Sequence, residues 1–132
     1  MYNRFYEYIS VECSLYKFHF GFRKYHYRAL SLIAVTDEIY QQRDNSNIVM
    51  GIYCDLQKAF DNVNHSILLS KIYNYGTRGT VFNWFKNYLI NRKQYVAIDN
   101  VSSTVSNIDY GVPQGSVLGP LLFLIYIRYP IL

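Results

Sequence analysis

Cysteine and proline are both scarce in this sequence, which holds two of the first and three of the second among 132 residues. Cys13 and Cys54 are too few and too far apart to indicate a disulfide framework or a zinc site. We therefore expect two reduced, largely buried thiols in an intracellular protein. A run of Lys and Arg that could direct the protein to the nucleus is also missing, so the sequence does not choose between nucleus and cytoplasm.

Long apolar segments are missing as well. The first residues, Met1–Arg4, contain no apolar run of the kind that forms a signal peptide. The stretch Val117–Ile127 is apolar, but Gly119 and Pro120 interrupt it, and it is shorter than the roughly 20 residues that cross a bilayer. We therefore expect a buried helix there and no association with membranes.

The residues that are present have a composition typical of one globular domain. Hydrophobic residues make up 51% of the chain and charged residues 17%, and the length suits a single core. The 15 tyrosines can fill such a core or stack on nucleic-acid bases, and composition leaves both readings open. A net charge of +4 and a pI near 9.0 are compatible with a nucleic-acid partner but do not require one.

The order of apolar and polar residues predicts an α+β fold in one domain. The apolar run Ile48–Asp55 predicts a buried strand that ends at Asp55. Asn64 is a candidate N-cap for a helix that ends at Gly76. The other predicted elements are helices over 2–13, 29–40 and 81–89, strands over 94–98 and 104–110 joined through a turn at Asp99–Asn100, a loop over 111–116, and an apolar helix that Ser116 can cap.

Asp55 and Asp61 are the first candidates for chemistry. A carboxylate at the end of a rigid strand is held in a fixed position, and Mg²⁺ in proteins prefers one or two carboxylates together with substrate phosphates. The spacing alone favours a structural role, in which Asp55 caps the turn Leu56–Lys58.

The loop Pro113–Ser116 and two basic pairs are further candidates. Glycine in the loop allows close approach of a ligand to the backbone, and N–H groups at a helix start can hold a phosphate. An ordinary strand-to-helix turn has the same composition. The pairs Arg23–Lys24 and Arg92–Lys93 can clamp phosphates or can simply lie on a solvated surface.

Two long motifs in a fixed order decide between these alternatives. The segments Tyr53–Asp61 (YCDLQKAFD) and Val63–Leu69 resemble motif A of the reverse transcriptases of non-LTR retrotransposons, of the LINE and jockey type. Gly111–Phe123 (GVPQGSVLGPLLF) resembles motif B of the same family. The connecting segment Tyr75–Arg92 and the entry motif Phe20–Lys24 also match, so that the resemblance covers nearly the whole chain.

This resemblance implies the palm of a right-hand polymerase with part of the fingers: helices of fingers and palm over 1–47, and palm with motifs A and B over 48–132. It implies that Asp55 is a catalytic residue and a ligand of two Mg²⁺ ions. It implies that Phe60 excludes the 2′-hydroxyl of the incoming sugar, and that Gln114 and Gly115 flank the nucleotide. Arg23 is assigned to nucleotide binding on the fingers side. The implied partners are an RNA template, a DNA primer and deoxynucleotides.

The sequence departs from the family where motif C is expected. The family continues with a hairpin that carries Tyr-x-Asp-Asp, whereas this chain reads Arg128–Leu132 after Ile127 and contains no Tyr-x-Asp-Asp. We expect a truncated domain without motif C and thumb, and a chain that does not polymerise by itself, because the aspartates that anchor both ions are missing. The strand Ile48–Cys54 then lacks a partner, and we expect self-association through its exposed edge.

Three functional readings therefore stand beside one another. The chain is a reverse transcriptase fragment that becomes active when the rest of a longer product is supplied. Alternatively it is a non-catalytic remnant that binds nucleic acid, or the product of a decayed mobile element with no selected function.

Overall fold

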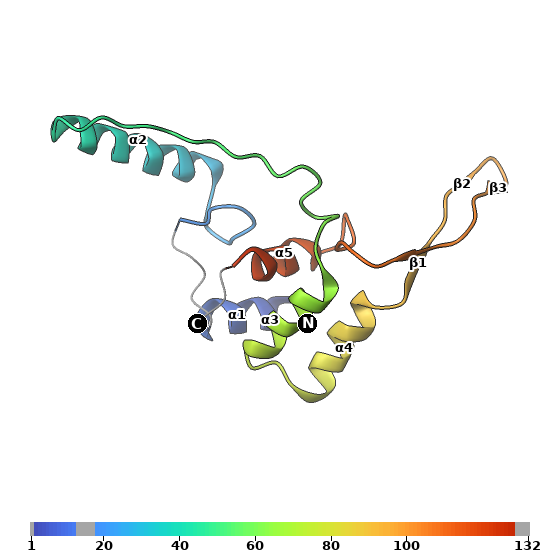
Figure 1. Cartoon of the computed structure of the whole chain (residues 1–132). Coiled ribbons are helices and arrows are strands. Elements are labelled where there is room, and N and C mark those ends of the chain that lie inside the picture. Colours follow the sequence, from blue (N-terminus) through green and yellow to red (C-terminus); the bar gives the residue numbers. More distant parts are fainter. Residues whose placement is uncertain (1, 13–17, 129–132) are drawn as a thin grey trace. The chain divides into compact units, whose positions relative to one another are not determined.

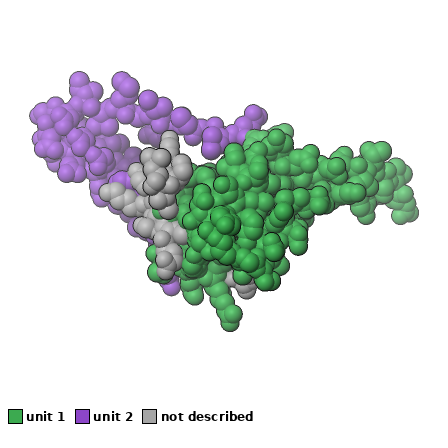
Figure 2. Space-filling view, turned by 60° about the horizontal axis from the view of Figure 1, so that its bottom comes forward, with its two compact units in different colours: residues 1–14, 58–132 green, residues 15–57 purple. Residues whose placement is uncertain are grey.

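The structure, a computed structural model, describes residues 2–12 and 18–128 (Figure 1). The chain divides into two compact units: residues 1–14 together with 58–132 form unit 1, and residues 15–57 form unit 2 (Figure 2). The elements of unit 1 are the helices α1 (Tyr2–Glu12), α3 (His65–Asn74), α4 (Gly79–Leu89) and α5 (Gly119–Ile127), and the short strands β1 (Arg92–Gln94), β2 (Ala97–Ile98), β3 (Val101–Ser102) and β4 (Ser106–Ile108). Unit 2 holds the helix α2 (Arg28–Asp44).

The core of unit 1 is built by the four helices. α3 packs against both α4 and α5, and α1 joins them through Phe5, whose ring centroid lies 4.5 Å from that of Phe85. The fully buried side chains come from all four helices and from the segment before α3: Ile9, Val63, Leu68, Ile72, Phe85, Leu89, Leu121, Leu122 and Ile125. The helices that the sequence predicts in these segments are therefore confirmed, although the apolar residues Ile67, Val81 and Trp84 of α3 and α4 are exposed.

Helix α3 begins and ends where the sequence predicts. The side chain of Asn64 accepts hydrogen bonds from the backbone N–H groups of Ser66 and Ile67 at 3.0 and 3.1 Å. These bonds satisfy donors that a helix start otherwise leaves without partners. Gly76 follows the helix with a φ of +84°, a conformation that glycine adopts without strain.

Helix α5 is the apolar helix expected after the loop. Pro120 lies in its first turn, where its missing N–H costs no helical hydrogen bond. The N-cap residue is Leu118 and not the predicted Ser116, but the Ser116 hydroxyl accepts a hydrogen bond from Gly119 N–H, the first residue of the helix, at 3.0 Å. None of the described helices is both long and apolar enough to cross a bilayer.

The strands form an antiparallel hairpin in two short sections. β1 pairs with β4, with Arg92 opposite Ile108, and β2 pairs with β3. Asp99 and Asn100 connect β2 to β3 with φ angles of +47° and +67°, as a tight turn of this type requires. The predicted turn and the predicted mixture of helices with a small sheet are confirmed.

The predicted strand Ile48–Asp55 is wrong. Residues 48–56 of unit 2 form neither helix nor strand, and every side chain in this range is exposed. Among the described residues no strand pairs with this segment, and an apolar run becomes a strand only when another strand satisfies its backbone. Cys54 is consequently exposed, against expectation, whereas Cys13 lies outside the described residues. α2 likewise buries none of its residues.

Candidate functional site

The centre of the site is a contact between two segments about fifty residues apart. Val112 N–H donates to the carbonyl oxygen of Phe60 at 3.0 Å, and Gly111 N–H donates to that of Val63 at 2.8 Å. An isolated antiparallel bridge between Asn64 and Tyr110 extends this pairing. The end of the first motif is therefore joined through its backbone to the start of the second.

Gly111 makes this close approach sterically feasible. Its φ is +91°, and a Cβ atom there would lie 3.0 Å from the carbonyl oxygen of Asp61 and 3.2 Å from that of Phe60. A side chain at this position would therefore be strained by its own backbone and would press on the neighbouring segment.

A side-chain hydrogen bond strengthens the junction. Gln114 Nε2 donates to Asp61 Oδ1 at 2.7 Å, and both side chains are exposed. A carboxylate accepts more strongly than a neutral oxygen, so this bond holds the Gln114 amide in one orientation. Gly115 follows in a turn with a φ of +75° and with no atom within 4 Å of the position that a Cβ would occupy.

Phe60 is fixed by an aromatic contact with α5. Its ring centroid lies 4.6 Å from that of Phe123 with the planes inclined by 29°, and the side chain is half-buried. Such a stacked pair restrains the Phe60 ring.

His65 is a member of this cluster that the sequence analysis missed. The ring is buried, and its Nε2 atom lies 2.7 Å from the carbonyl oxygen of Gly111, to which it donates in the Nε2–H tautomer. The two residues are 46 positions apart, and nothing in the spacing of a single sequence indicates their contact. His65 therefore ties the start of α3 to the loop that carries Gln114.

A cleft of about 560 Å³ opens beside this junction, all within unit 1. Its lining includes Asp61 and Gln114 together with Arg92 and Gln94 of β1. The cleft therefore combines a hydrogen-bonding amide with a guanidinium, the groups that can contact a base and a phosphate.

Asp55 and Arg23 belong to unit 2 and are described within that unit. The Asp55 side chain is exposed. A guanidinium nitrogen of Arg23 donates to the carbonyl oxygen of His19 at 3.1 Å. Burial lowers the pKa of His19, and the positive charge of Arg23 lowers that pKa further. Of the predicted site residues, Phe60, Gln114 and Gly115 thus lie in one unit, and Asp55 and Arg23 lie in the other.

The side chains that the structure describes form no cluster of three metal ligands. Over 2–12 and 18–128, no three His, Cys, Asp or Glu side chains gather closely enough to hold an ion. Asp61, the carboxylate nearest to the junction, accepts from Gln114 instead.

Comparison with known proteins places these motifs in one family. The family described as "Reverse transcriptase (RNA-dependent DNA polymerase)" matches residues 6–131. The RNA-directed DNA polymerase from the mobile element jockey of Drosophila melanogaster is 34% identical over 117 residues, which are 89% of this chain and 13% of that protein. The probable RNA-directed DNA polymerase from transposon X-element of the same species is 37% identical over 107 residues, 81% of this chain and 12% of that protein. The RNA-directed DNA polymerase from mobile element jockey of Drosophila funebris is 35% identical over 117 residues, which again are 89% of this chain and 13% of that protein. This chain thus spans about an eighth of the length of these relatives, and no solved structure matches it.

Proposed function

The chain belongs to the reverse transcriptase family, and from this premise we propose that it serves as the nucleotide-binding palm segment of an RNA-directed DNA polymerase of a non-LTR retrotransposon. The relatives that it matches are retrotransposon polymerases by name. The substrates proposed for this chain are the RNA template, the DNA primer and the deoxynucleotides of that reaction.

The observation that carries the proposal is the hydrogen bond between Gln114 and Asp61. It ties the amide of the second motif to Asp61, the residue that follows Phe60 in the first. In our proposal, Gln114 and Gly115 flank the incoming nucleotide, and Asp61 orients the Gln114 amide without binding metal. The ring of Phe60, held by Phe123, stands against the 2′ position of the sugar and favours deoxynucleotides.

The roles that we propose for Asp55 and Arg23 rest only on the membership of the chain in this family. Reverse transcriptases generally use divalent metals, and we propose Asp55 as a ligand of Mg²⁺ and Arg23 as a residue of the fingers that contacts the nucleotide. Since these 132 residues contain no Tyr-x-Asp-Asp, the carboxylates that would complete the metal site must be supplied from outside them. We therefore expect no polymerisation by the 132-residue chain on its own.

A primer-extension assay tests that expectation. The purified chain and its Asp55→Ala variant are incubated with an RNA template, a DNA primer, Mg²⁺ and deoxynucleotides. We expect no extension from either protein. Extension that disappears in Asp55→Ala would show that the missing carboxylates are replaced from elsewhere, for example by a second subunit, and our expectation of inactivity would be wrong.

A chimera tests the function itself. The residues of this chain replace the matching 117-residue stretch of the Drosophila melanogaster jockey polymerase. We expect extension by the chimera, its loss in Asp55→Ala, and increased use of ribonucleotides in Phe60→Ala. A chimera that extends equally well with Asp55→Ala would contradict the proposed role of Asp55, and unchanged sugar selection in Phe60→Ala would contradict that of Phe60.

A further inference from the structure

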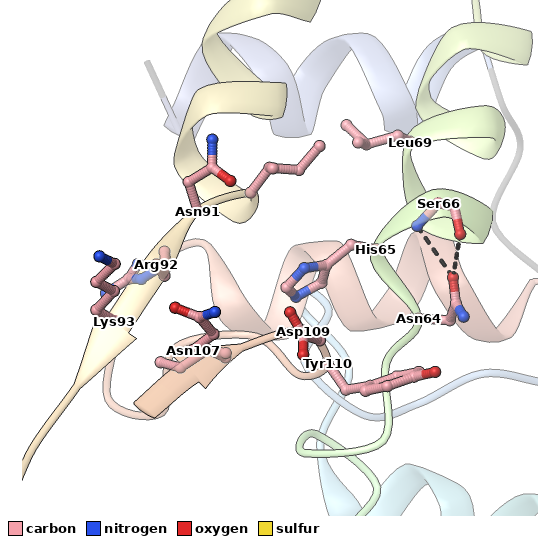
Figure 3. Close-up of a pocket in the computed structure, with 12 residues that line it drawn as sticks. Asn64, His65, Ser66, Leu69, Asn91, Arg92, Lys93, Asn107, Asp109 and Tyr110 are labelled. Atoms are coloured by element: carbon pink, nitrogen blue, oxygen red, sulfur yellow. Dashed lines mark hydrogen bonds between the residues drawn. The ribbon is translucent and has the colours of Figure 1, made fainter. Parts of the chain in front are cut away.

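Unit 1 holds a further cleft that the proposed nucleotide site does not use. It shares no lining residue with the cleft at the base of the β1–β4 hairpin, which Figure 3 shows with His65 and Arg92 in its lining. The further cleft has a volume of about 680 Å³ and is lined by the first two turns of α1, the segment 76–78 and the first two turns of α4. We call it the α1–α4 cleft, and its lining includes Arg4, Phe5, Tyr8, Thr77, Val81 and Trp84.

The aromatic walls of the α1–α4 cleft are restrained by contacts within unit 1. The Tyr8 hydroxyl donates to the carbonyl oxygen of Tyr75 at 2.5 Å. The Trp84 ring stacks on the ring of Tyr88 with the centroids 5.2 Å apart, and it meets the ring of Phe85 edge-on at the same distance. Because these side chains are restrained before a ligand arrives, binding costs little further conformational entropy in the walls.

The charged side chains of the cleft are all positive. Arg4 and Arg78 line it, and its described lining contains no carboxylate. The Arg78 guanidinium donates to the carbonyl oxygens of Tyr73 and Thr77, and its central carbon lies 3.4 Å from the centroid of the Tyr73 ring. Both hydrogen bonds come from one nitrogen, and a guanidinium has five N–H donors in all. A fixed positive charge with further donors therefore lies at the residue before α4.

The start of α4 adds backbone donors to the cleft. Its N-cap residue, Arg78, makes no capping bond with its side chain, and the first turn contains no acidic residue. Thr80 and Val81 of this turn line the cleft. The first N–H groups of a helix have no acceptor within the helix, and the helix dipole favours a negative charge beside them. The start of α4 therefore lacks an anionic cap that the carboxylate of a ligand can supply.

A hydroxyl without a partner is the second, independent sign of a ligand. Thr77 lines the cleft and is 7% exposed, and its Oγ1 atom is buried with no hydrogen-bond partner among the described residues. Burying a hydroxyl in this state costs free energy, and an acceptor supplied by a ligand removes that cost. The two arginines, the start of α4 and Thr77 thus all favour a ligand that carries a carboxylate.

The exposure of the walls decides between a small molecule and a peptide. The side chains of Tyr8, Val81 and Trp84 are 38%, 46% and 39% exposed. Pockets for small ligands bury roughly 70–90% of the ligand surface, and walls as open as these do not enclose a ligand to that extent. A peptide can lay an apolar side chain on such walls while the rest of it stays in water.

We propose that the α1–α4 cleft binds a partner peptide in which an acidic residue precedes apolar residues. The carboxylate caps the start of α4 beside Arg78 and accepts from the Thr77 hydroxyl, and an apolar side chain covers Val81 and Trp84. This binding uses no nucleic acid, nucleotide or metal, so it goes beyond the proposed function and does not depend on it.

The test uses the whole 132-residue chain and a synthetic peptide, acetyl-Gly-Asp-Leu-Leu-Gly-amide, whose counterpart carries Asn in place of Asp. Trp84 is the one tryptophan of the chain and the peptides contain none, so tryptophan fluorescence reports on a wall of the cleft. We expect the Asp peptide to shift the emission to shorter wavelength, because it covers the indole. The Asn peptide should bind about fivefold to tenfold more weakly, which is the difference between a charged and a neutral acceptor.

Two charge variants separate the cleft from a general attraction between charges. Arg4→Gln removes one positive charge from the lining, and Lys86→Gln removes one from an exposed position of α4 outside the cleft. We expect Arg4→Gln to weaken the Asp peptide about twofold to fivefold and to leave the Asn peptide unchanged. Lys86→Gln should change neither. Thermal unfolding of each variant shows whether the fold is intact.

Thr77→Val keeps the shape of the side chain and removes the hydroxyl. We expect a higher Tm for the free chain, because a buried hydroxyl without a partner is gone, together with about fivefold weaker binding of the Asp peptide. A threonine with a purely structural role would instead lower the Tm and leave the affinity unchanged, which would contradict the proposal.

The proposal is overturned if the two peptides bind equally, if Lys86→Gln acts like Arg4→Gln, or if the Asp peptide leaves the Trp84 emission unchanged at millimolar concentration. It is also overturned if phenylacetate binds as tightly as the peptide, because the cleft is then a small-molecule site. Displacement of the peptide by oligo-dT would assign the cleft to nucleic acid instead. A peptide that only lowers the average mass in sedimentation equilibrium would assign it to a second copy of the chain, and either result would contradict the proposal.

Discussion

The junction between the two motifs can be tested by adding one methyl group. Gly111→Ala places a Cβ atom 3.0 Å from the carbonyl oxygen of Asp61 and 3.1 Å from its Cα atom. Gly115→Ala is the matched control, because Gly115 also has a positive φ but has nothing within 4 Å of the same atom. Both variants make the same chemical change, and both restrict the unfolded chain to the same extent.

The expected magnitudes follow from this difference. A non-glycine residue at positive φ costs roughly 1–2 kcal/mol, and both variants carry this cost. Gly111→Ala must in addition push the Phe60–Asp61 backbone away, which weakens the hydrogen bonds from Val112 and Gly111 that hold it. Each such bond contributes about 1 kcal/mol. We therefore expect Gly111→Ala to lower the free energy of unfolding by about 2–4 kcal/mol and Gly115→Ala by about 1–2 kcal/mol.

Urea unfolding followed by tryptophan fluorescence measures both values. Trp84 is the one tryptophan of the sequence, and its ring stacks on Tyr88 within the helical part of unit 1. In thermal unfolding, a difference of 1 kcal/mol corresponds to roughly 4–8 °C in Tm for a domain of this size. Equal unfolding free energies for the two variants, within about 0.5 kcal/mol, would show that Gly111 is not closely packed against the first motif, and the junction described above would be refuted.

Three further predictions concern other contacts. Asn64→Ala should lower the free energy of unfolding by about 1 kcal/mol through loss of the α3 cap, whereas Asn83→Ala, at an exposed position of α4, should not lower it in the same urea titration. His65→Leu should cost about 1–3 kcal/mol, because the buried Gly111 carbonyl loses its donor; an unchanged urea midpoint would show that the ring is not needed there. We propose that the exposed apolar segment of unit 2 drives self-association. Ile52→Lys, at a side chain that is 82% exposed, should therefore lower the average mass in sedimentation equilibrium, and a wild-type chain that is monomeric at every concentration would contradict this proposal.

Local signals predicted much of the fold of unit 1. Three of these signals involve only residues within four positions of one another: the cap at Asn64, the turn at Asp99–Asn100, and Pro120 in the first turn of α5. Signals of this kind can be recognised in the sequence itself. The prediction of a strand over Ile48–Asp55 was wrong because a strand depends on contacts that are not local. The composition of this segment favours a strand, but a strand forms only when a second strand pairs with its backbone. Whether a second strand is present depends on residues far away in the chain, which the composition of the segment does not indicate.

The candidate site was predictable as a set of residues and not as a set of contacts. Phe60, Gln114 and Gly115 were identified through the family motifs, and the structure adds what fixes them: the ring of Phe123 and the carboxylate of Asp61. These partners come from segments far apart in the chain, and no periodicity connects them. The same holds for His65, whose bond to Gly111 could not have been inferred from its position alone. The roles of Asp55 and Arg23 stay predictions.

The division of unit 1 into two stretches of sequence affects how the chain is synthesised. Phe5 and Phe85 contact each other in the core, yet at 5–20 residues per second the ribosome needs roughly 4–16 s to add the about 80 residues between them. During that time α1, a helix of 11 residues and too short to be stable in water by itself, cannot pack against α4. The segment that forms α1 is therefore exposed to chaperones and proteases until α4 has been synthesised.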